Sequence, residues 1–269
     1  HDLYHVKPNG IMTIVLPHGV LFRGGDEEKI RTNLIEEKNI DAIIGLPANI
    51  FFGTGIPTII IVLKQKRNSE DILIVDASKG FVKEGKNNRL RACDIKRITD
   101  AVVNRSDIPK FSKKVSRQTI RENGYNLNIP RYVDSSADAE SWDIYASMFG
   151  GIPNTEIDTL ANYWAAFPTL RAQLFNSDDT PYSSLSAQDV KQTIADNADV
   201  RRFTELFNTA FATLPAYLKD ELIDKMQTLN VAQEENKISI DIFNRLSDVP
   251  LIDRYQAYQL LDDQWTKIA

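Results

Sequence analysis

The sequence predicts an α/β fold for its first half and a mainly helical region for its second half. In the first half, short apolar runs rich in Ile and Val alternate with a segment that has the apolar spacing of a helix. In the second half, apolar residues recur three and four positions apart, which is typical of helices. We therefore predict two regions, residues 1–134 and residues 135–269.

The first region begins with the apolar strand Ile11–Leu16. A parallel strand of this kind is buried on both faces and needs neighbours on each side. A helix is predicted over 26–37, because Asp26 suits the N-cap and the acidic first turn complements the helix dipole. The next strand, Ile40–Ile44, should run parallel to the first, as a right-handed crossover through a helix requires.

Two further strands complete the predicted sheet. No helix fits in the loop after Ile40–Ile44, so Ile56–Leu63 most simply returns antiparallel to it. Ile72–Asp76 follows a polar turn and adds another strand at that end. The expected sheet is largely parallel with an antiparallel closing hairpin. A helix over about 90–103 and an extended or hairpin segment over 122–134 come after it.

Beyond Ser135 we expect helices, with several prolines at their breaks or starts. Phe203, Phe207 and Phe211 sit at helical spacing, and such a stripe predicts a core or helix–helix contact surface. The predicted helices cover residues 137–148, 154–175, 186–212, 215–229 and 253–268.

Length and composition are those of a globular chain. At 269 residues, with 42% hydrophobic and 26% charged residues, the chain can bury a sizeable core. No apolar run reaches the length of a membrane span, and the N-terminus lacks the layout of a signal peptide. The single cysteine, Cys93, excludes an intramolecular disulfide and a cysteine-rich zinc site, which fits a cytoplasmic protein.

Charge is unevenly distributed along the chain. Residues 1–134 contain 22 Lys or Arg and 16 Asp or Glu, whereas residues 135–269 contain 10 and 21. The stretch from Lys79 to Arg117 carries 12 basic and 4 acidic residues. One interpretation of this stretch is a solvated surface, and the other is a surface that faces a polyanion.

The most informative segment is the loop between Ile40–Ile44 and Ile56–Leu63. Residues 45–58 read Gly-Leu-Pro-Ala-Asn-Ile-Phe-Phe-Gly-Thr-Gly-Ile-Pro-Thr. Turns favour Gly, Pro, Asn and Asp, so a pair of aromatic residues at a loop tip departs from the usual composition. Phe51 and Phe52 suit a platform on which a flat ligand stacks, and the alternative is a hydrophobic plug over the end of the sheet.

Several other chemistries are excluded because their motifs are absent. The sequence has no GxxxxGK[ST], GxGxxG, HExxH or GxSxG pattern. The chain has three histidines, His1, His5 and His18, and one cysteine, and no metal site is predicted. His18 follows the first strand, where ligands of α/β folds bind, although a capping or packing role is the more frequent one.

Three segments resemble the modification subunit of type I restriction–modification systems. They are NGIMTIVLPHGVLF (9–22), LPxxxFxxTGIPT (46–58) and NLNIPRYVD (126–134), with Ile30-Arg31 between the first two. The resemblance is specific over about residues 1–134 and looser beyond them. It implies that 1–134 holds the last strands of a Rossmann-like, S-adenosylmethionine-dependent methyltransferase sheet, and that 135–269 is a helical region for subunit contacts.

The resemblance implies an activity, partners and a base-binding residue. The family transfers a methyl group from S-adenosylmethionine to N6 of adenine in DNA, and it works with a specificity subunit, a restriction subunit and a second modification subunit. Because adenine N6 cannot be reached inside a duplex, the base is flipped into a pocket and held by stacking. The position that matches the family's stacking aromatic is Phe51, and Phe52, Thr54 and His18 are expected to line the pocket.

The resemblance gives the basic stretch a role in DNA binding. It would contact DNA phosphates and supply salt-sensitive, sequence-independent affinity, while sequence choice resides in the specificity subunit. The side chains expected to contact phosphates are Lys79, Lys83, Lys86, Arg89, Lys113 and Lys114.

Two parts of the family's active site are not expected in this chain. The methyl-donor loop, of the Phe-x-Gly-x-Gly type, and the Asn-Pro-Pro-[Phe/Tyr] motif lie upstream of the first strand in these proteins, and Asn-Pro-Pro occurs nowhere in the sequence. The chain also begins at His1 without an initiator methionine. We therefore expect the C-terminal part of a longer adenine-specific DNA methyltransferase, with no catalytic residue, no bound cofactor and no activity of its own.

Two other functions are alternatives. A non-catalytic nucleic-acid-binding or assembly module with a Rossmann-like remnant would use the acidic helical half as its surface and keep Phe51 in the core. A Rossmann-type enzyme that acts on a small substrate is the other. The exposure of Phe51 separates them, because an exposed ring at a cleft supports base stacking and a fully buried ring supports the plug.

Overall fold

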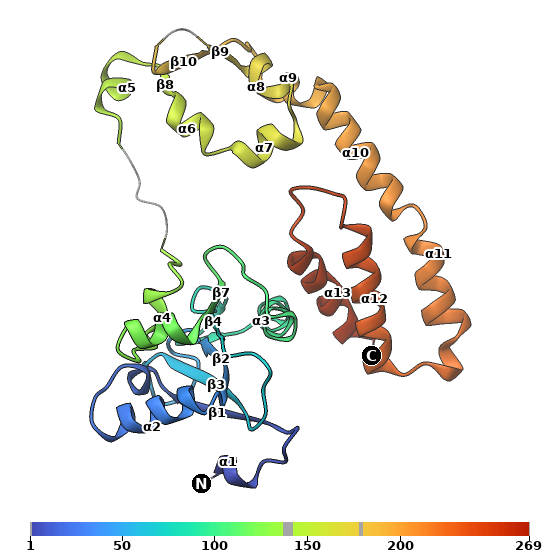
Figure 1. Cartoon of the computed structure of the whole chain (residues 1–269). Helices are drawn as coiled ribbons and strands as arrows, with labels where there is room; N and C mark the ends of the chain where they lie inside the picture. Colours follow the sequence, from blue (N-terminus) through green and yellow to red (C-terminus); the bar gives the residue numbers. More distant parts are fainter. Residues whose placement is uncertain (1, 137–141, 178–179, 269) are drawn as a thin grey trace. The chain divides into compact units, whose positions relative to one another are not determined.

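A computed structural model describes residues 2–136, 142–177 and 180–268 of the chain (Figure 1). The chain divides into two units, His1–Asp138 and Ala139–Ala269, and each is described by itself. Within the described residues, no helix combines the length and the apolar character that crossing a membrane requires.

A five-stranded mixed sheet forms the centre of the first unit. In their order across the sheet, its strands are β1 (Ile11–Pro17), β3 (Thr58–Lys64), β2 (Ile40–Gly45), β4 (Ile72–Asp76) and β7 (Ser112–Val115). β3 pairs antiparallel with both β1 and β2. β4 pairs parallel with β2 and antiparallel with β7.

The predicted strands are confirmed, but their predicted arrangement is partly wrong. β1 and β2 run in the same direction, and β3 returns antiparallel to β2, as expected. However, β3 lies between β1 and β2, and β4 lies on the far side of β2, so one of the four pairings between described strands is parallel. The sheet is therefore not largely parallel. The loop after β2 connects two antiparallel strands directly, and β3 pairs with β1 as well as with β2.

β1 is an edge strand of the described sheet. Its residues alternate between the core and solvent, and Ile11 and Val15 are 63% and 49% exposed. The alternate residues Met12, Ile14 and Leu16 pack against the core. The expectation that this strand is buried on both faces is therefore not met within the described residues.

Helices cover both faces of the sheet, with α3 on one side and α2 and α4 on the other (Figure 1). Alternate residues of the strands enter opposite cores, as the pleat requires. The helical segments of this unit are α1 (Asp2–His5), η1 (His18–Leu21), α2 (Asp26–Glu36), α3 (Ala92–Asn104), α4 (Arg117–Glu122) and η2 (Ile129–Arg131). α2 and α3 confirm two predicted helices, although Gly25 and not Asp26 is the N-cap residue of α2.

The buried side chain of Arg31 joins three parts of the first unit. Its guanidinium donates to the carbonyl oxygens of Tyr125 at 2.7 Å, Val20 at 2.8 Å and Arg23 at 3.0 Å. Burial lowers the pKa of Arg31, which the nearby carboxylates of α2 partly offset. Arg31 thus ties α2 to the segment after β1 and to the segment that follows α4.

A cluster of charged side chains is buried where β2 begins. Asp41 accepts hydrogen bonds from Arg67 Nε at 2.9 Å and from Arg105 Nη1 at 2.6 Å. Lys64 Nζ lies 2.7 Å from the other oxygen of Asp41, and Arg105 also donates to Asp71 at 2.6 Å. The side chains of Arg67 and Asp41 are 3% and 6% exposed. Because buried charges are tolerated only when they are paired, this cluster fixes the turn after β3 and the end of α3 against β2.

The second unit is mainly helical but also contains a three-stranded antiparallel sheet that the sequence pattern does not predict. Its strands, in spatial order, are β8 (Ile152–Pro153), β10 (Tyr182–Leu185) and β9 (Phe175–Ser177). The helical segments are α5 (Ile144–Phe149), α6 (Asn154–Asp158), α7 (Ala161–Ala166), α8 (Leu170–Leu174), α9 (Val190–Asp196), α10 (Ala198–Phe211), α11 (Leu214–Lys219), η3 (Asp220–Asp224), η4 (Met226–Thr228), α12 (Val231–Arg245) and α13 (Arg254–Ile268).

The predicted helices 154–175 and 186–212 are broken in the structure. The first is divided into α6, α7 and α8 and runs into β9. The second is interrupted at Asn197, whose side chain accepts hydrogen bonds from the backbone amides of Asp199 and Val200 and so starts α10. An asparagine side chain that caps a new helix competes with continuation of the previous one.

The remaining helix predictions agree with the structure only in part. α12 is missing from the predicted set, although Asn230 caps it and the buried Ile238 and Ile242 lie four residues apart. The predicted helix 215–229 ends in η3 and η4, and 253–268 is confirmed as α13. Of the predicted helix 137–148, residues 137–141 lie outside the described residues, and α5 begins at Ile144.

Candidate functional site

The candidate site lies at the edge of the sheet where β1, β2 and β4 end. The last residues of β2 and β4, Gly45 and Asp76, are register partners, and the Ala77 amide donates to the Gly45 carbonyl at 2.9 Å. The His18 amide, just after β1, donates to the Pro57 carbonyl at 3.3 Å. Three connections therefore meet here, and ligands of open α/β sheets bind outside such carboxyl ends.

The loop 46–57 between β2 and β3 carries the aromatic pair. Phe51 is 42% exposed and Phe52 is 92% exposed, whereas the neighbouring Ile50 packs against the core. Neither phenylalanine ring is buried as a plug over the sheet would be. The loop thus presents aromatic surface to solvent at the edge where the strands end.

Backbone constraints shape this loop. The Leu46 amide donates to the Thr58 carbonyl at 2.9 Å and closes its base. Asn49 has φ = 54°, Gly53 has φ = 79°, and the Thr54 hydroxyl accepts a hydrogen bond from the Ile56 amide at 3.2 Å. A glycine at positive φ removes the cost that a side chain would impose there. Thr54 therefore helps to hold the loop conformation.

Residues 51–55 of the loop also match the Phe-x-Gly-x-Gly pattern, which we expected only upstream of the chain. Here the pattern connects two antiparallel strands. A glycine-rich loop that holds a nucleotide-type cofactor connects a strand to the N-terminus of a helix, whose free amides receive the ligand. The pattern in this loop is therefore not a methyl-donor loop, and these residues do not fit S-adenosylmethionine.

Asp76 is the carboxylate at this edge, and it is occupied by structural contacts. It accepts hydrogen bonds from the Ser78 amide at 3.0 Å and from the Ser135 hydroxyl. His18 packs edge-on against Phe22, with ring centroids 5.6 Å apart. Burial lowers the pKa of His18, and the carboxylate of Asp76 acts in the opposite direction. A neutral imidazole among these groups is a packing element of the site.

We expect His18 to make the first unit less stable in mild acid. Its folded pKa lies below the ordinary value, so the unfolded chain binds the proton more readily. Stability is then full above the unfolded pKa of about 6.5 and falls as the pH drops through it towards the folded pKa. His18→Gln should remove this part of the pH dependence of urea unfolding of the first unit. Identical pH profiles for His18→Gln and the parent chain would show that other groups are responsible.

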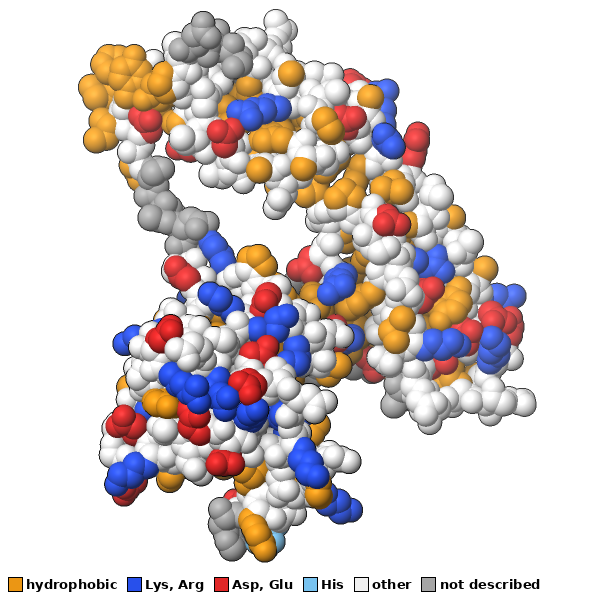
Figure 2. Space-filling model, in the orientation of Figure 1, with side chains coloured by type: hydrophobic (Ala, Val, Ile, Leu, Met, Phe, Trp, Pro, Cys, Tyr) orange, Lys and Arg blue, Asp and Glu red, His pale blue; other side chains and the backbone are white. Residues whose placement is uncertain are grey.

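The six basic residues predicted to contact phosphates are all exposed, but they are not all free of partners. Arg89 pairs with Glu84 at 3.0 Å, and Lys114 lies 3.7 Å from Asp107. Over the described part of the chain, the other four make no ion pair. Figure 2 shows basic side chains intermixed with acidic ones on the first unit. The four unpaired residues are Lys79, Lys83, Lys86 and Lys113.

These six residues lie in three places in the first unit: after β4, on β7, and on a two-stranded hairpin. Lys79 follows β4 at the edge of the candidate site, and Lys113 and Lys114 lie on the outer strand β7. Lys83, Lys86 and Arg89 belong to a two-stranded hairpin formed by β5 (Val82–Glu84) and β6 (Asn87–Arg89).

The β5–β6 hairpin is fastened to the aromatic loop by Asn88. The Asn88 amide donates to the Asn49 carbonyl at 2.8 Å, and its side-chain Nδ2 donates to the Ala48 carbonyl at 2.7 Å. Sequence reasoning missed this residue. The Gly85-Lys86 turn signals a hairpin, but nothing in the sequence indicates that Asn88 reaches a loop forty residues earlier.

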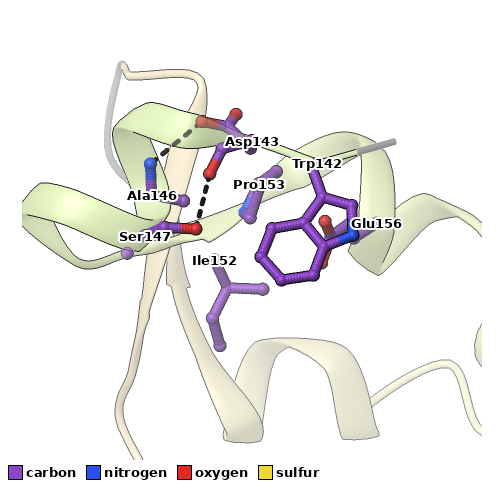
Figure 3. Close-up of a pocket in the computed structure, with 8 residues that line it drawn as sticks. Trp142, Asp143, Ala146, Ser147, Ile152, Pro153 and Glu156 are labelled. Atoms are coloured by element: carbon purple, nitrogen blue, oxygen red, sulfur yellow. Dashed lines mark hydrogen bonds between the residues drawn. The ribbon is translucent and has the colours of Figure 1, made fainter. Parts of the chain in front are cut away.

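A pocket of about 340 Å³ lies between α5, β8 and α6 in the second unit (Figure 3). Its Asp143 caps α5, because the Ala146 amide donates to Oδ1 at 2.9 Å, and the Tyr182 hydroxyl donates to Oδ2 at 3.1 Å. Burial, followed by that hydrogen bond, raises the pKa of Tyr182. Trp142 lines the pocket and is exposed. We assign a structural role to Asp143, which holds the helix start and the small sheet together.

No cluster of three or more His, Cys, Asp or Glu side chains is placed to hold a metal ion in the described ranges. The candidate site therefore consists of aromatic rings, a fixed loop and nearby unpaired lysines. These are the groups that bind nucleic acid without reading its sequence, by stacking on bases and neutralising phosphates.

Comparison with known proteins gives a family match over this part of the chain. A model of the family described as N-6 DNA Methylase matches residues 1–141. The chain is 41% identical over 145 residues to the type I restriction enzyme MpnII methylase subunit of Mycoplasma pneumoniae, covering 54% of this chain and 27% of that relative. It is 39% identical over 137 residues to the type I restriction enzyme MjaVII methylase subunit of Methanocaldococcus jannaschii, covering 49% and 24%.

A solved structure is also similar. The crystal structure of the type I restriction-modification system methyltransferase subunit from Streptococcus thermophilus aligns with 49% of this chain and 28% of its own chain, at 54% identity and a TM-score of 0.48. The chain thus spans about a quarter of the length of the curated relatives named above. The sequence matches confirm the resemblance to type I modification subunits that segments 9–22, 46–58 and 126–134 indicated.

Proposed function

The chain belongs to the N-6 DNA methylase family, and we propose that it is the C-terminal part of the modification subunit of a type I restriction–modification system. The complete subunit transfers a methyl group from S-adenosylmethionine to N6 of adenine in DNA. It acts in the cytoplasm together with a specificity subunit, a restriction subunit and a second modification subunit. Residues 135–269 provide contacts to these subunits.

In this proposal residues 1–134 are the last strands of a Rossmann-like methyltransferase sheet. The support comes from β1, which in the described sheet pairs on one side with β3 and leaves its other backbone edge without a partner strand. Unpaired backbone groups on an edge strand favour pairing with a further strand. The rest of the methyltransferase sheet lies on that side of β1.

The observation that carries the proposal is the exposed Phe51 in a segment that matches the family. Its ring is available at the edge where the strands end, and the loop beneath it is closed by hydrogen bonds. Stacking on an aromatic side chain stabilises an extrahelical base by about 1–3 kcal/mol. Phe51 stacks on the flipped adenine, and Phe52, Thr54 and His18 lie around it.

The residues of this chain hold the target base and the DNA backbone, and we assign them no contact with the methyl donor. The donor, when bound by the complete protein, supplies the methyl group. The chain alone is therefore inactive. Transfer of radiolabelled methyl groups to DNA by the complete subunit with its specificity subunit, and not by residues 1–269, is the expected result. A complete subunit that binds DNA but transfers no methyl group would favour the assembly or binding module instead.

Lysines of the basic stretch should contribute separately to DNA affinity. We expect Lys79→Ala, Lys83→Ala and Lys86→Ala each to weaken binding on all sequences alike and to reduce the slope of log K against log salt by about one. Lys29→Ala is the charge-matched control, because Lys29 is exposed on α2 and pairs with Asp26. Affinity can be measured by fluorescence anisotropy at several salt concentrations. Equal slopes for all four variants and the parent would remove these lysines from the interface.

A further inference from the structure

The β5–β6 hairpin and the loop 46–57 are joined by the two hydrogen bonds of Asn88, one from its backbone amide and one from its side chain. We infer that Asn88 is a positioning residue that couples phosphate binding by the hairpin lysines to base stacking by Phe51. The inference rests on the proposed function. It adds a specific claim, that the hairpin and the loop act as one clamp on DNA.

The register of the hairpin places a lysine on the side that faces the loop. Lys83 and Asn88 are directly opposite each other in the pairing of β5 with β6. Cross-strand partners project their side chains from the same face of the ribbon. Because the Asn88 side chain points to Ala48 of the loop, Lys83 shares the loop-facing side of the hairpin.

The opposite face of the hairpin carries a balanced ion pair. Glu84 and Arg89 are diagonal neighbours on that face, and their side chains lie 3.0 Å apart. Lys86 lies in the two-residue turn, next to Gly85 with φ = 63°. Such a turn is short and stiff, so the two strands fix the position of the tip. The unpaired positive charges of the hairpin are therefore at its tip and on its loop-facing side.

The two hydrogen bonds hold the loop close to its aromatic tip. They fix the carbonyls of Ala48 and Asn49, which precede Phe51 by three residues and two residues. Asn49 has a positive φ, which asparagine tolerates better than most residues, and the bond from the Asn88 amide holds its carbonyl in this conformation. Phosphate contacts orient a protein on DNA. Because the hydrogen bonds of Asn88 join the hairpin to the loop, phosphate contacts of the hairpin also position the Phe51 ring.

The test uses the complete modification subunit with its specificity subunit and a DNA duplex that carries 2-aminopurine at the target adenine. Fluorescence lifetimes at saturating DNA separate target base stacked in the duplex, stacked on protein and unstacked, and the salt dependence of affinity reports phosphate contacts. Asn88→Ala should lower the ratio of stacked to unstacked target base about fivefold, the factor expected for one neutral hydrogen bond, while the salt slope stays near that of the parent. Asn87→Ala, one residue away on the same strand, should behave as the parent.

A second pair of variants keeps the inference testable if Asn88→Ala loosens the fold. Asn88→Asp has the same shape but replaces the amide donor by an acceptor, and Asn87→Asp adds the same charge next to it. We expect Asn88→Asp to lose base stacking and Asn87→Asp to retain it at matched DNA occupancy. Equal losses in the two variants would show that only charge matters and would overturn the coupling.

A double-mutant cycle separates this inference from the proposed function. Lys83→Ala should lower the stacked fraction when Asn88 is present and should have no further effect in Asn88→Ala, because the coupling is then already lost. Additive effects would overturn the coupling and leave the role of Phe51 intact. If Phe51→Ala itself leaves the fluorescence unchanged, base stacking by this loop fails, and the coupling fails with it.

Discussion

Replacing Phe51 by alanine in the complete subunit is expected to lower kcat/KM for adenine methylation between about fivefold and about a hundredfold. The range follows from the loss of one base–aromatic stack, about 1–3 kcal/mol, at about 1.4 kcal/mol for each factor of ten. Because Phe51 is partly exposed on a loop, its loss should change the stability of the first unit little. Methyl transfer to a duplex with one target site, measured over a range of DNA concentrations, gives the comparison.

Phe52 provides the matched control for this substitution. It is the adjacent residue of the same type and is more exposed, so Phe52→Ala removes the same chemical group from the same loop. We expect a smaller loss of methylation than for Phe51→Ala. Phe51→Tyr, which keeps an aromatic face, should retain most of the activity. Unchanged methylation and DNA affinity in Phe51→Ala would refute the stacking role.

The second large effect is expected at the charge cluster around Asp41. Asp41→Asn keeps the shape of the side chain but leaves Arg67 and Arg105 without the carboxylate that they share. Removal of one partner from a buried ion pair costs about 3–5 kcal/mol, because the remaining charge stays buried. The free energy of unfolding of the first unit should fall by that amount. Asp26→Asn, at an exposed pair with Lys29, should change it by about 0.5 kcal/mol or less.

The position of the tryptophans makes this measurement specific. All three, Trp142, Trp164 and Trp265, lie beyond residue 138, so tryptophan fluorescence follows the second unit. Unfolding of the first unit can be followed by hydrogen exchange of the amides in β2 and β4. Asp41→Asn should shift the exchange transition in urea and leave the fluorescence transition in place. A shift of both transitions together would mean that the two units unfold cooperatively, and a shift of neither would mean that the cluster stabilises little.

The sequence predicts the strands β1, β2, β3 and β4 well, because each is a run rich in β-branched residues bounded by turn residues. It does not predict β5, β6 and β7, which are short and mostly polar. It also does not predict the order of the strands. The insertion of β3 between β1 and β2 depends on long-range pairing, such as Ile14 with Ile61, which periodicity within one segment cannot reveal. In the second unit, the predicted helix 186–212 is interrupted at Asn197, and the predicted helix 154–175 is divided into α6, α7 and α8. The strands β8 and β10 form in segments between the predicted helices.

The candidate site shows the same division between local and long-range information. The aromatic pair, the glycines and the prolines of the loop are visible in the sequence, and the family resemblance predicts that Phe51 is the stacking residue. The contact of Asn88 with the loop cannot be predicted from the sequence, because its partners Ala48 and Asn49 are distant in the chain. The Phe-x-Gly-x-Gly pattern at 51–55 connects two strands, as the lack of a helical segment in the sequence predicts and the pairing of β2 with β3 confirms.

The order β1-β3-β2 also determines how the sheet can assemble during folding. β1 and β2 precede β3 in the chain, yet β3 is the neighbour of both, with Ile11 opposite Lys64 at one end of the sheet. The sheet therefore cannot grow strand by strand from its edge as the polypeptide is synthesised. β1 and β2 gain the strand that they share only when β3 has been synthesised after the loop 46–57. Such dependence on contacts distant in sequence slows folding. The loop that carries Phe51 connects β2 to β3, so the pairing of β3 with β1 and β2 depends on this loop.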